Sequence, residues 1–142
     1  MRLTALRREH LQELKLQSAQ AYLGADLTAP GYFEMLMAGQ AFTGMVGDTV
    51  IGCAGCIEQW DNRSIAWALV SAHAGRHMVG VHRAVAGFLA QARWRRVETF
   101  VDAEFAEGHR WMGMLGFAHE GRMTAFSPDG RDFDLYARVR KC

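Results

Sequence analysis

The sequence has little of what marks a secreted, membrane-spanning or nucleic-acid-binding protein. Its 142 residues include three cysteines, Cys53, Cys56 and Cys142, which are too few and odd in number for a disulfide framework. No run of about 18 apolar residues occurs, so we expect no membrane-spanning helix. Sixteen Lys and Arg balance fifteen Asp and Glu, which argues against a basic nucleic-acid-binding protein. No linker or low-complexity tract divides the chain, so we expect one domain over residues 1–142.

What the sequence does contain is typical of a globular protein with its own core. Half of the residues are apolar and 22% are charged, close to ordinary globular usage. A chain of this length buries roughly two-thirds of its unfolded surface, so a core forms without disulfides or metal. The segment Met1–His10 is too charged for a signal peptide. We therefore expect a cytoplasmic protein without a membrane or nucleic-acid partner.

Hydrophobic periodicity predicts elements in the order β-α-α-β-β-β-α-β-α-β-β. Strands are expected at residues 1–5, 41–46, 49–59, 64–71, 97–102, 117–126 and 131–139. Helices are expected at residues 7–21, 31–38, 79–93 and 107–115, the last ending at Gly116. Gly47-Asp48 is typical of a hairpin turn, and Ser127–Gly130 of a type I turn.

This order predicts an α/β fold. A three-strand meander followed by a strand–helix–strand crossover implies a mixed, mostly antiparallel central sheet of about seven strands. Helices then cover both faces of that sheet. The continuous apolar run Ser64–Ser71 is typical of a strand that is covered on both faces.

The segment from Val70 to His82 is the strongest candidate for ligand binding. A buried strand that runs into a helix leaves backbone N–H groups unpaired at the helix start. Their partial positive charge can hold a phosphate, and Arg76 or Arg83 can add a charge-assisted contact. An ordinary strand-to-helix connection capped by water is the alternative interpretation of the same residues.

The element order and the segment Gly108–Phe117, which closes on Leu-Gly-Phe, resemble the GCN5-related N-acetyltransferase (GNAT) superfamily. The element order is similar over nearly the whole chain, and the sequence pattern over residues 64–139. The resemblance implies that the long strand, the following loop and its helix bind acetyl-CoA, whose acetyl group passes directly to a substrate amine. It places the cofactor contacts on backbone groups at the strand end and at the helix start: Val70, Ser71, Ala72, Met78, Val79, Gly80, Val81 and His82.

The runs EGHRWMGMLGF, EGR and SPDGRDFDLYARV are also similar to small acetyltransferase-like proteins of tailed phages and prophages. Some relatives in that group are internal virion proteins. This similarity implies the host cytoplasm or the virion as the location, and phage virion proteins as partners.

The chain departs from the family pattern at three positions. The family's pyrophosphate loop has the form Gln/Arg-x-x-Gly-x-Gly/Ala, and residues His77–His82 align with it. Gly80 is kept, but His77 replaces Gln or Arg, and His82 replaces a small residue that lets the phosphate approach closely. Met112 falls where many members carry the Tyr that protonates the leaving thiolate, and a thioether donates no proton. Either another acid substitutes, the thiolate leaves unassisted, or there is no catalysis.

A general base must take a proton from the substrate ammonium. Glu58, at the end of the third strand, and His73, just past the fourth, are the candidates. A solvated strand-end charge and a plain loop residue are the respective alternative interpretations. His109 is interpreted as a surface or capping residue, and Glu104 as a solvent-facing one.

Cys53 and Cys56 suggest a metal or redox site. Residues three apart on a strand point to opposite faces, so the two sulfurs cannot chelate one ion without a bulge. We therefore expect both cysteines to pack in the core, and no metal.

The sequence thus favours an acyl-CoA-dependent N-acyltransferase that moves acetyl to a primary amine on a small molecule or a protein. Two non-catalytic alternatives stay open. One is a GNAT-fold phage structural or interaction protein with a decayed cofactor loop, and the other is a CoA-binding regulatory module. Superfamily relatives often dimerise, so a homodimer is considered as well.

Overall fold

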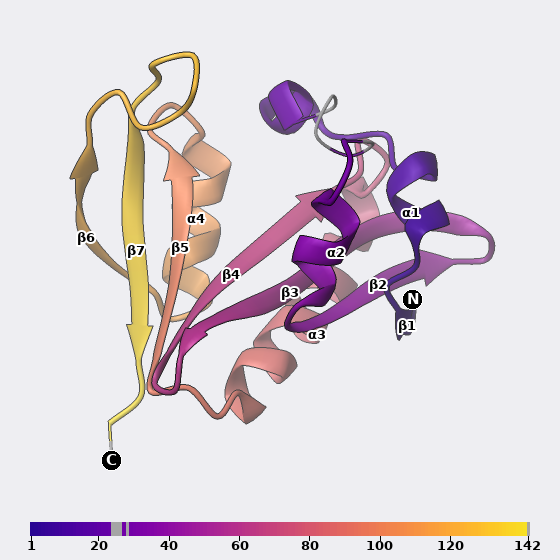
Figure 1. The fold of residues 1–142 in the computed structure, drawn as a ribbon. Helices are drawn as coiled ribbons and strands as arrows, with labels where there is room; N and C mark the ends of the chain where they lie inside the picture. Colours follow the sequence, from indigo (N-terminus) through magenta and orange to yellow (C-terminus); the bar gives the residue numbers. More distant parts are fainter. Residues whose placement is uncertain (24–26, 28, 142) are drawn as a thin grey trace. The chain divides into compact units, whose positions relative to one another are not determined.

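The computed structural model describes residues 1–23, 27 and 29–141, which form a seven-stranded sheet (Figure 1). The strands are β1 (Arg2–Ala5), β2 (Gln40–Val46), β3 (Thr49–Trp60), β4 (Arg63–Val70), β5 (Arg96–Asp102), β6 (Ala118–Met123) and β7 (Phe133–Val139). Their order in the sheet is β1-β2-β3-β4-β5-β7-β6. β4 and β5 run parallel, whereas β1–β2, β2–β3, β5–β7 and β6–β7 are antiparallel. The mixed, mostly antiparallel sheet predicted from the sequence is confirmed.

The helices are α1 (Arg8–Glu13), α2 (Tyr32–Met37), α3 (Met78–Gln91) and α4 (Ala106–Met114), with 3-10 turns η1 (Ser18–Leu23) and η3 (Gly75–His77). None of the helices in the described residues is long and apolar enough to cross a membrane. The chain divides into two compact units. The first comprises residues 1–58 and 66–92, and the second comprises residues 59–65 and 93–142.

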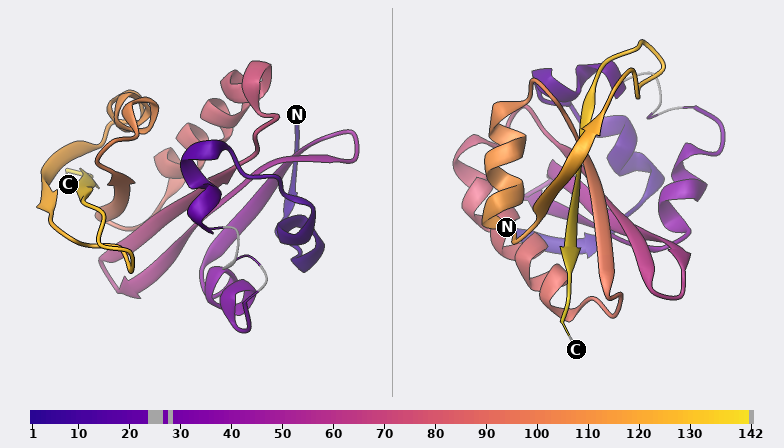
Figure 2. Two further views of the ribbon diagram at one scale, coloured as in Figure 1. Left: turned by 90° about the horizontal axis from the view of Figure 1, so that it is seen from above. Right: turned by 90° about the vertical axis from the view of Figure 1, so that its left-hand side faces the viewer.

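In the first unit, helices cover both faces of the sheet, as predicted (Figure 1, Figure 2). α1 and α2 lie on one face, where Leu11, Leu36 and Leu69 belong to the buried core. α3 lies on the other face, where Phe88 packs against Phe42 of β2 with ring centroids 5.5 Å apart. The apolar residues of this unit therefore form a layer on each side of the strands.

In the second unit, α4 lies against β5 and β7. It ends at Gly116, the residue at which the sequence predicts its end. Gly116 has a φ of 86°, a left-handed conformation that favours glycine. The Phe117 amide donates to the Met112 carbonyl at 2.9 Å, and the Gly116 amide donates to the Gly113 carbonyl at 3.1 Å. This pair of bonds is a Schellman motif, so the predicted stop at Gly116 is confirmed.

Both predicted tight turns are present. Val46 pairs with Thr49 across Gly47-Asp48, which forms the two-residue hairpin between β2 and β3. Before β7, the Gly130 amide donates to the Ser127 carbonyl at 2.8 Å, which is the hydrogen bond of a β-turn.

The helix expected over residues 7–21 is wrong beyond Glu13. Leu14 adopts an extended backbone, with φ −71° and ψ 123°, and Leu16 forms an antiparallel bridge with Ser71 just after β4. Leu11 and Leu14 are both buried, as their helical spacing predicted. The backbone that follows pairs with the end of β4 instead of continuing the helix, and this long-range pairing leaves no signal in the local periodicity.

Cys53 and Cys56 are buried in the core, as predicted, and neither forms a disulfide. The register of β3 against β2 runs without a shift from Cys53 to Cys56, so the two thiols point to opposite faces. Cys142 lies outside the described residues.

Candidate functional site

The segment predicted to bind a cofactor lies within the first unit, at the end of β4 and the start of α3. Val70 is 6% exposed and Ser71 is 3% exposed, whereas Ala72 and His73 lie at the surface. The chain therefore leaves the core at Ser71. Ala74, three residues further, is buried again at 2% exposed, and its amide donates to the Ser71 carbonyl at 3.1 Å.

The Gln20 side chain pairs with one edge of β4 at the residues predicted to hold the cofactor. The Val70 amide donates to Gln20 Oε1 at 2.9 Å, and Gln20 Nε2 donates to the Ala68 carbonyl at 2.8 Å. The opposite edge of β4 faces β3, where the Ser71 amide donates to the Ile51 carbonyl at 2.9 Å. One carboxamide thus satisfies a donor and an acceptor on the edge of β4 that β3 leaves uncovered.

Backbone groups continue this pairing along the same edge. The Gln17 amide donates to the Val70 carbonyl at 2.9 Å, and the Ala72 amide donates to the Lys15 carbonyl at 2.6 Å. Alternate residues of a strand bond to the same side, so these contacts and those of Gln20 form one ladder. We call residues 15–20 the N-terminal strap, because they cover this edge of β4.

The helical segment begins one turn earlier than predicted. The His77 amide donates to the Ala74 carbonyl at 2.6 Å, and the Met78 amide donates to the Gly75 carbonyl. Met78, one of the predicted contacts, therefore already uses its amide inside the turn. The amides of Gly75 and Arg76 precede these bonds, so they are the ones that a helix start leaves without an intrahelical partner.

Open space surrounds the predicted phosphate loop. A Cβ built on Gly80 would meet only the Met1 side chain, no closer than 3.6 Å, so the fold itself does not require glycine there. Val79 is 65% exposed. The remaining predicted contacts grade from the surface inward: Arg76 and Arg83 are exposed, His77, Met78 and His82 are half-buried, and Val81 is buried.

The structure does not bring the two candidate bases together. Ser71, at the end of β4, bonds to Ile51 of β3, and Glu58 lies seven residues further along that strand. At about 3.3 Å per residue, Glu58 is about 23 Å away along β3. The His73 amide donates to Ser71 Oγ at 3.0 Å, and the His73 side chain is exposed. Of the two candidates, His73 alone lies beside the predicted cofactor segment.

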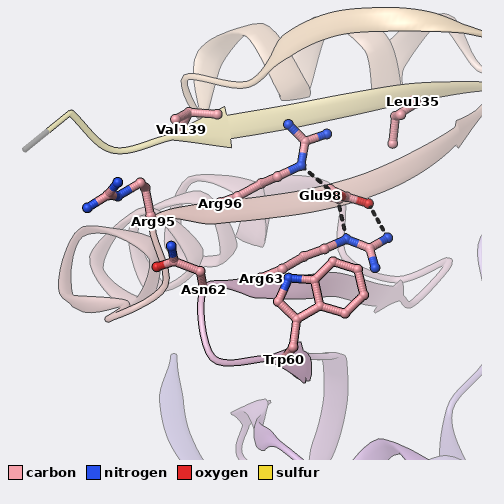
Figure 3. A pocket seen from close by; sticks show the side chains of 8 residues that line it. All are labelled: Trp60, Asn62, Arg63, Arg95, Arg96, Glu98, Leu135 and Val139. Carbon is pink, nitrogen blue, oxygen red and sulfur yellow. Dashed lines mark hydrogen bonds and ion pairs between the residues drawn. The ribbon is translucent and has the colours of Figure 1, made fainter.

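The second unit holds an open pocket of about 640 Å³ that the sequence did not predict (Figure 3). Its lining residues come from the β3–β4 turn, β5 and β7: Trp60, Asn62, Arg63, Arg95, Arg96, Glu98, Leu135 and Val139. Three arginines against one glutamate give this lining a positive charge. Such a lining attracts anions and repels a cationic amine.

Ion pairs hold three of the charged side chains that line this pocket. Arg63 Nε and Nη2 donate to Glu98 at 2.6 and 2.8 Å, and Arg96 Nε donates to Glu98 at 2.6 Å (Figure 3). Hydrogen bonds from Arg63, and then those from Arg96, lower the pKa of Glu98 to about 2, although burial opposes the shift. Arg63 also lies over the Trp60 ring, 4.5 Å from its centroid, while Trp60 is 61% exposed.

His109 is neither a plain surface residue nor a helix cap, so that interpretation is wrong. The half-buried ring lies between two strands: the Tyr136 hydroxyl donates to His109 Nδ1 at 2.6 Å, and His109 Nε2 donates to the Asp102 carbonyl at 3.0 Å. The ring therefore ties α4 to β5 and β7.

Solved structures provide the comparison for this arrangement, since no protein-family model and no curated protein matches the sequence. Aminoglycoside 6′-acetyltransferase type Ii superposes with a TM-score of 0.74 at 16% identity, over 98% of this chain and 97% of its own. A chimera of Vibrio cholerae spermidine N-acetyltransferase SpeG and hSSAT gives a TM-score of 0.69 at 14% identity, over 98% and 96%. A GNAT family acetyltransferase from Elizabethkingia anophelis with acetyl-CoA bound gives 0.66 at 11%, over 83% and 87%.

The chain has the GNAT fold. The Leu-Gly-Phe motif, on which the sequence resemblance was based, forms the end of α4 at Gly116. Met112, at the position predicted for a Tyr in the GNAT pattern, is 8% exposed and gives its carbonyl to that stop. The motif is therefore a marker of fold, and its conformational role is independent of acyl transfer.

Two parts of the candidate sites have no signal in the sequence. The N-terminal strap was assigned to a helix, because Leu11, Leu14 and Ser18 keep a helical spacing. The pocket of Figure 3 was missed because its buried carboxylate, Glu98, depends on Arg63, which is 35 residues away. Arg95 and Arg96 of this lining are adjacent in the sequence, but their neighbours in the pocket are not.

Proposed function

We propose that this protein binds acetyl-CoA at the β4–α3 junction and transfers its acetyl group to a primary amine. The observation that carries the proposal is the GNAT fold itself, which a solved relative with acetyl-CoA bound shares. The acceptor amine would belong to a small molecule or a protein. The named relatives that act on spermidine and aminoglycosides are consistent with a small polyamine-like acceptor.

The local geometry fits an anionic pyrophosphate. The amides of Gly75 and Arg76 stand at the start of a helical segment, where N–H groups and the helix dipole favour negative charge. The Arg76 and Arg83 guanidinium groups are exposed near that start and can add charge-assisted hydrogen bonds. Since nothing but the Met1 side chain approaches Gly80, a phosphate group can come close to the backbone there.

Bound acetyl-CoA would supply a thioester whose carbonyl carbon forms a bond to the amine nitrogen as the C–S bond breaks. In this proposal His73 accepts the proton that the substrate ammonium must lose before the amine attacks, directly or through water. The thiolate that leaves also needs a proton, and the Met112 thioether cannot give one. In this proposal the thiolate is protonated by water or by the protonated base.

The alternative is a GNAT-fold structural or interaction protein of a phage or prophage, without acyl transfer. Two observations favour it. The strap already occupies the β4 edge at Val70 and Ala72, and Met112 stands where a proton donor would be needed. A CoA-binding regulatory protein, the other alternative, would bind acetyl-CoA but would not transfer its acetyl group.

Ligand-dependent stability tests the binding step. Acetyl-CoA at 100 times its Kd stabilises the fold by about 2.7 kcal/mol, which raises Tm by roughly 5–11 °C. The Gly80→Val variant is expected to lose most of this shift. Gly87→Val is the matched control, because it places the same side chain on the same helix, α3, where a Cβ has nothing within 4 Å.

Release of free thiol from acetyl-CoA in the presence of spermidine or kanamycin tests the transfer step. Thiol release with either amine supports the acetyltransferase. A thermal shift without thiol release across an amine panel supports the regulatory protein. A flat thermal response to millimolar acetyl-CoA leaves the non-binding alternative.

A further inference from the structure

The Gln20 carboxamide presents one amide unit to the edge of β4. Its oxygen accepts from the Val70 amide at 2.9 Å, and its nitrogen donates to the Ala68 carbonyl at 2.8 Å. A residue of a neighbouring strand offers the same pair of one acceptor and one donor to a strand edge, from the two peptide groups that flank its Cα. The edge of β4 at Ala68 and Val70 is therefore suited to an amide-bearing chain. In this structure the Gln20 side chain supplies the amide.

The rest of the strap fills the positions on either side of this amide. The Val70 carbonyl accepts from the Gln17 amide, and the Ala72 amide donates to the Lys15 carbonyl. Val70 and Ala72 are among the residues whose backbone the proposed function assigns to acetyl-CoA. The pantetheine arm of that molecule carries two secondary amides, so it needs the same kind of hydrogen-bond partners.

We propose that the N-terminal strap is an internal competitor for the cofactor edge of β4, and that Gln20 sets the affinity for the pantetheine arm. This inference rests on the proposed function, since it assumes that acetyl-CoA is bound along β4. The occupant that replaces Gln20 must bring an amide acceptor for Val70 and an amide donor for Ala68. A protonated polyamine carries N–H donors and no acceptor, so it does not meet that requirement.

Part of the strap can be displaced without unfolding the rest of the first unit. Gln17 and Gln20 are half-buried and Lys15 is exposed, whereas Leu14, just before the strap, is 7% exposed and stays in the core. Rotation of the Gln20 side chain alone frees the Val70 amide and the Ala68 carbonyl, without opening the apolar layer. The cost of entry is then the loss of two hydrogen bonds, which a C=O group and an N–H group from the two amides of the pantetheine arm replace.

Gln20→Ala tests the competition with two fragments of the cofactor. Calorimetric titration with pantetheine and with 3′-phosphoadenosine 5′-diphosphate separates the amide arm from the nucleotide. Removing the competitor is expected to tighten binding of pantetheine and of acetyl-CoA by about tenfold, the effect of two ordinary hydrogen bonds on a closed state. The affinity for the nucleotide fragment is expected to stay unchanged.

Two further variants serve as controls for this experiment. Gln12→Ala removes an exposed glutamine of α1 and is expected to leave every affinity unchanged. Gln20→Glu keeps the volume of the side chain and its acceptor for Val70 but loses the donor to Ala68, so it also tightens pantetheine binding. It keeps the inference testable if Gln20→Ala fails to fold.

The outcomes separate this inference from the proposed function. Acetyl-CoA binding that is equal in the wild type, Gln20→Ala and Gln20→Glu overturns the inference and leaves the proposed function standing. Absence of binding in all of these proteins overturns both. Binding that appears or tightens only when Gln20 is replaced, with the nucleotide fragment unaffected, supports both.

Discussion

The Arg63 guanidinium donates two hydrogen bonds to the Glu98 carboxylate, at 2.6 and 2.8 Å. Glu98 is 5% exposed, and its pKa is lowered from 4.5 to about 2. A lowered folded-state pKa contributes stability that is fully present above about pH 4.5 and is lost as the pH falls toward 2. We expect a loss on the order of 3 kcal/mol over that interval, measured by urea unfolding at a series of pH values.

Glu98→Gln removes the titrating group and serves as the comparison. The variant is expected to be less stable than the wild type at pH 7, because it leaves Arg63 and Arg96 without their shared anion. Its stability should change less between pH 5 and pH 3. A wild-type slope equal to that of Glu98→Gln would show that Glu98 does not carry the acid sensitivity.

Two glycines of α4 and its stop are expected to respond to alanine with opposite signs. Gly116 has a φ of 86°, so Gly116→Ala forces a side chain into the left-handed region and costs about 1–2 kcal/mol. Gly113 lies inside the helix with nothing within 4 Å of a Cβ, so Gly113→Ala gains up to about 1 kcal/mol from helix propensity. Thermal unfolding measures both, and a Gly116→Ala variant as stable as the wild type would contradict the assigned Schellman motif.

The Cys53 thiol is expected to be unreactive in the folded protein. Burial raises the pKa of Cys53 to about 11, so the reactive thiolate is scarce at pH 8. In a Cys142→Ser background, a thiol reagent should modify Cys53 and Cys56 only as fast as the protein unfolds. Rapid modification at pH 8 without denaturant would show that β3 is more accessible than its burial indicates.

If acetyl transfer is observed, His73 and Glu58 are expected to differ in their effect on the rate. His73 lies beside the proposed cofactor segment, so His73→Ala should lower kcat by about a hundredfold, the range of a lost general base. Glu58 lies about 23 Å away along β3, so Glu58→Gln should leave kcat within about twofold. The reverse result would move the acceptor to the other end of β4.

The periodic elements of this chain were predictable because their signals are local. The run Ser64–Ser71 is apolar on both faces, Gly47-Asp48 can form a tight hairpin, and Gly116 adopts the conformation that ends a helix. Each of these features depends on neighbours within a few residues. The order of such elements was enough to indicate the GNAT fold.

The strap and the buried ion pair were not predictable because their partners are distant in the sequence. Gln20 bonds to Val70 across 50 residues, and Glu98 bonds to Arg63 across 35. Glutamine is common at helix surfaces, and glutamate is common on exposed strand faces, so neither residue carries a signal of its own. The proposed cofactor segment is indicated in the sequence by its junction of strand and helix, but which amides it leaves available depends on the early start of η3.

The strap also has a consequence for how the chain avoids self-association. β4 pairs with β5 from Arg63 to Ile65, and beyond this pairing a bare edge at Ala68–Ala72 would offer a template for a strand of another molecule. Residues 15–20 are synthesised long before β4, so the cover is present when that edge first forms on the ribosome. A chain that lacks residues 15–20 would therefore expose an unpaired strand edge during synthesis, and we expect it to aggregate during expression.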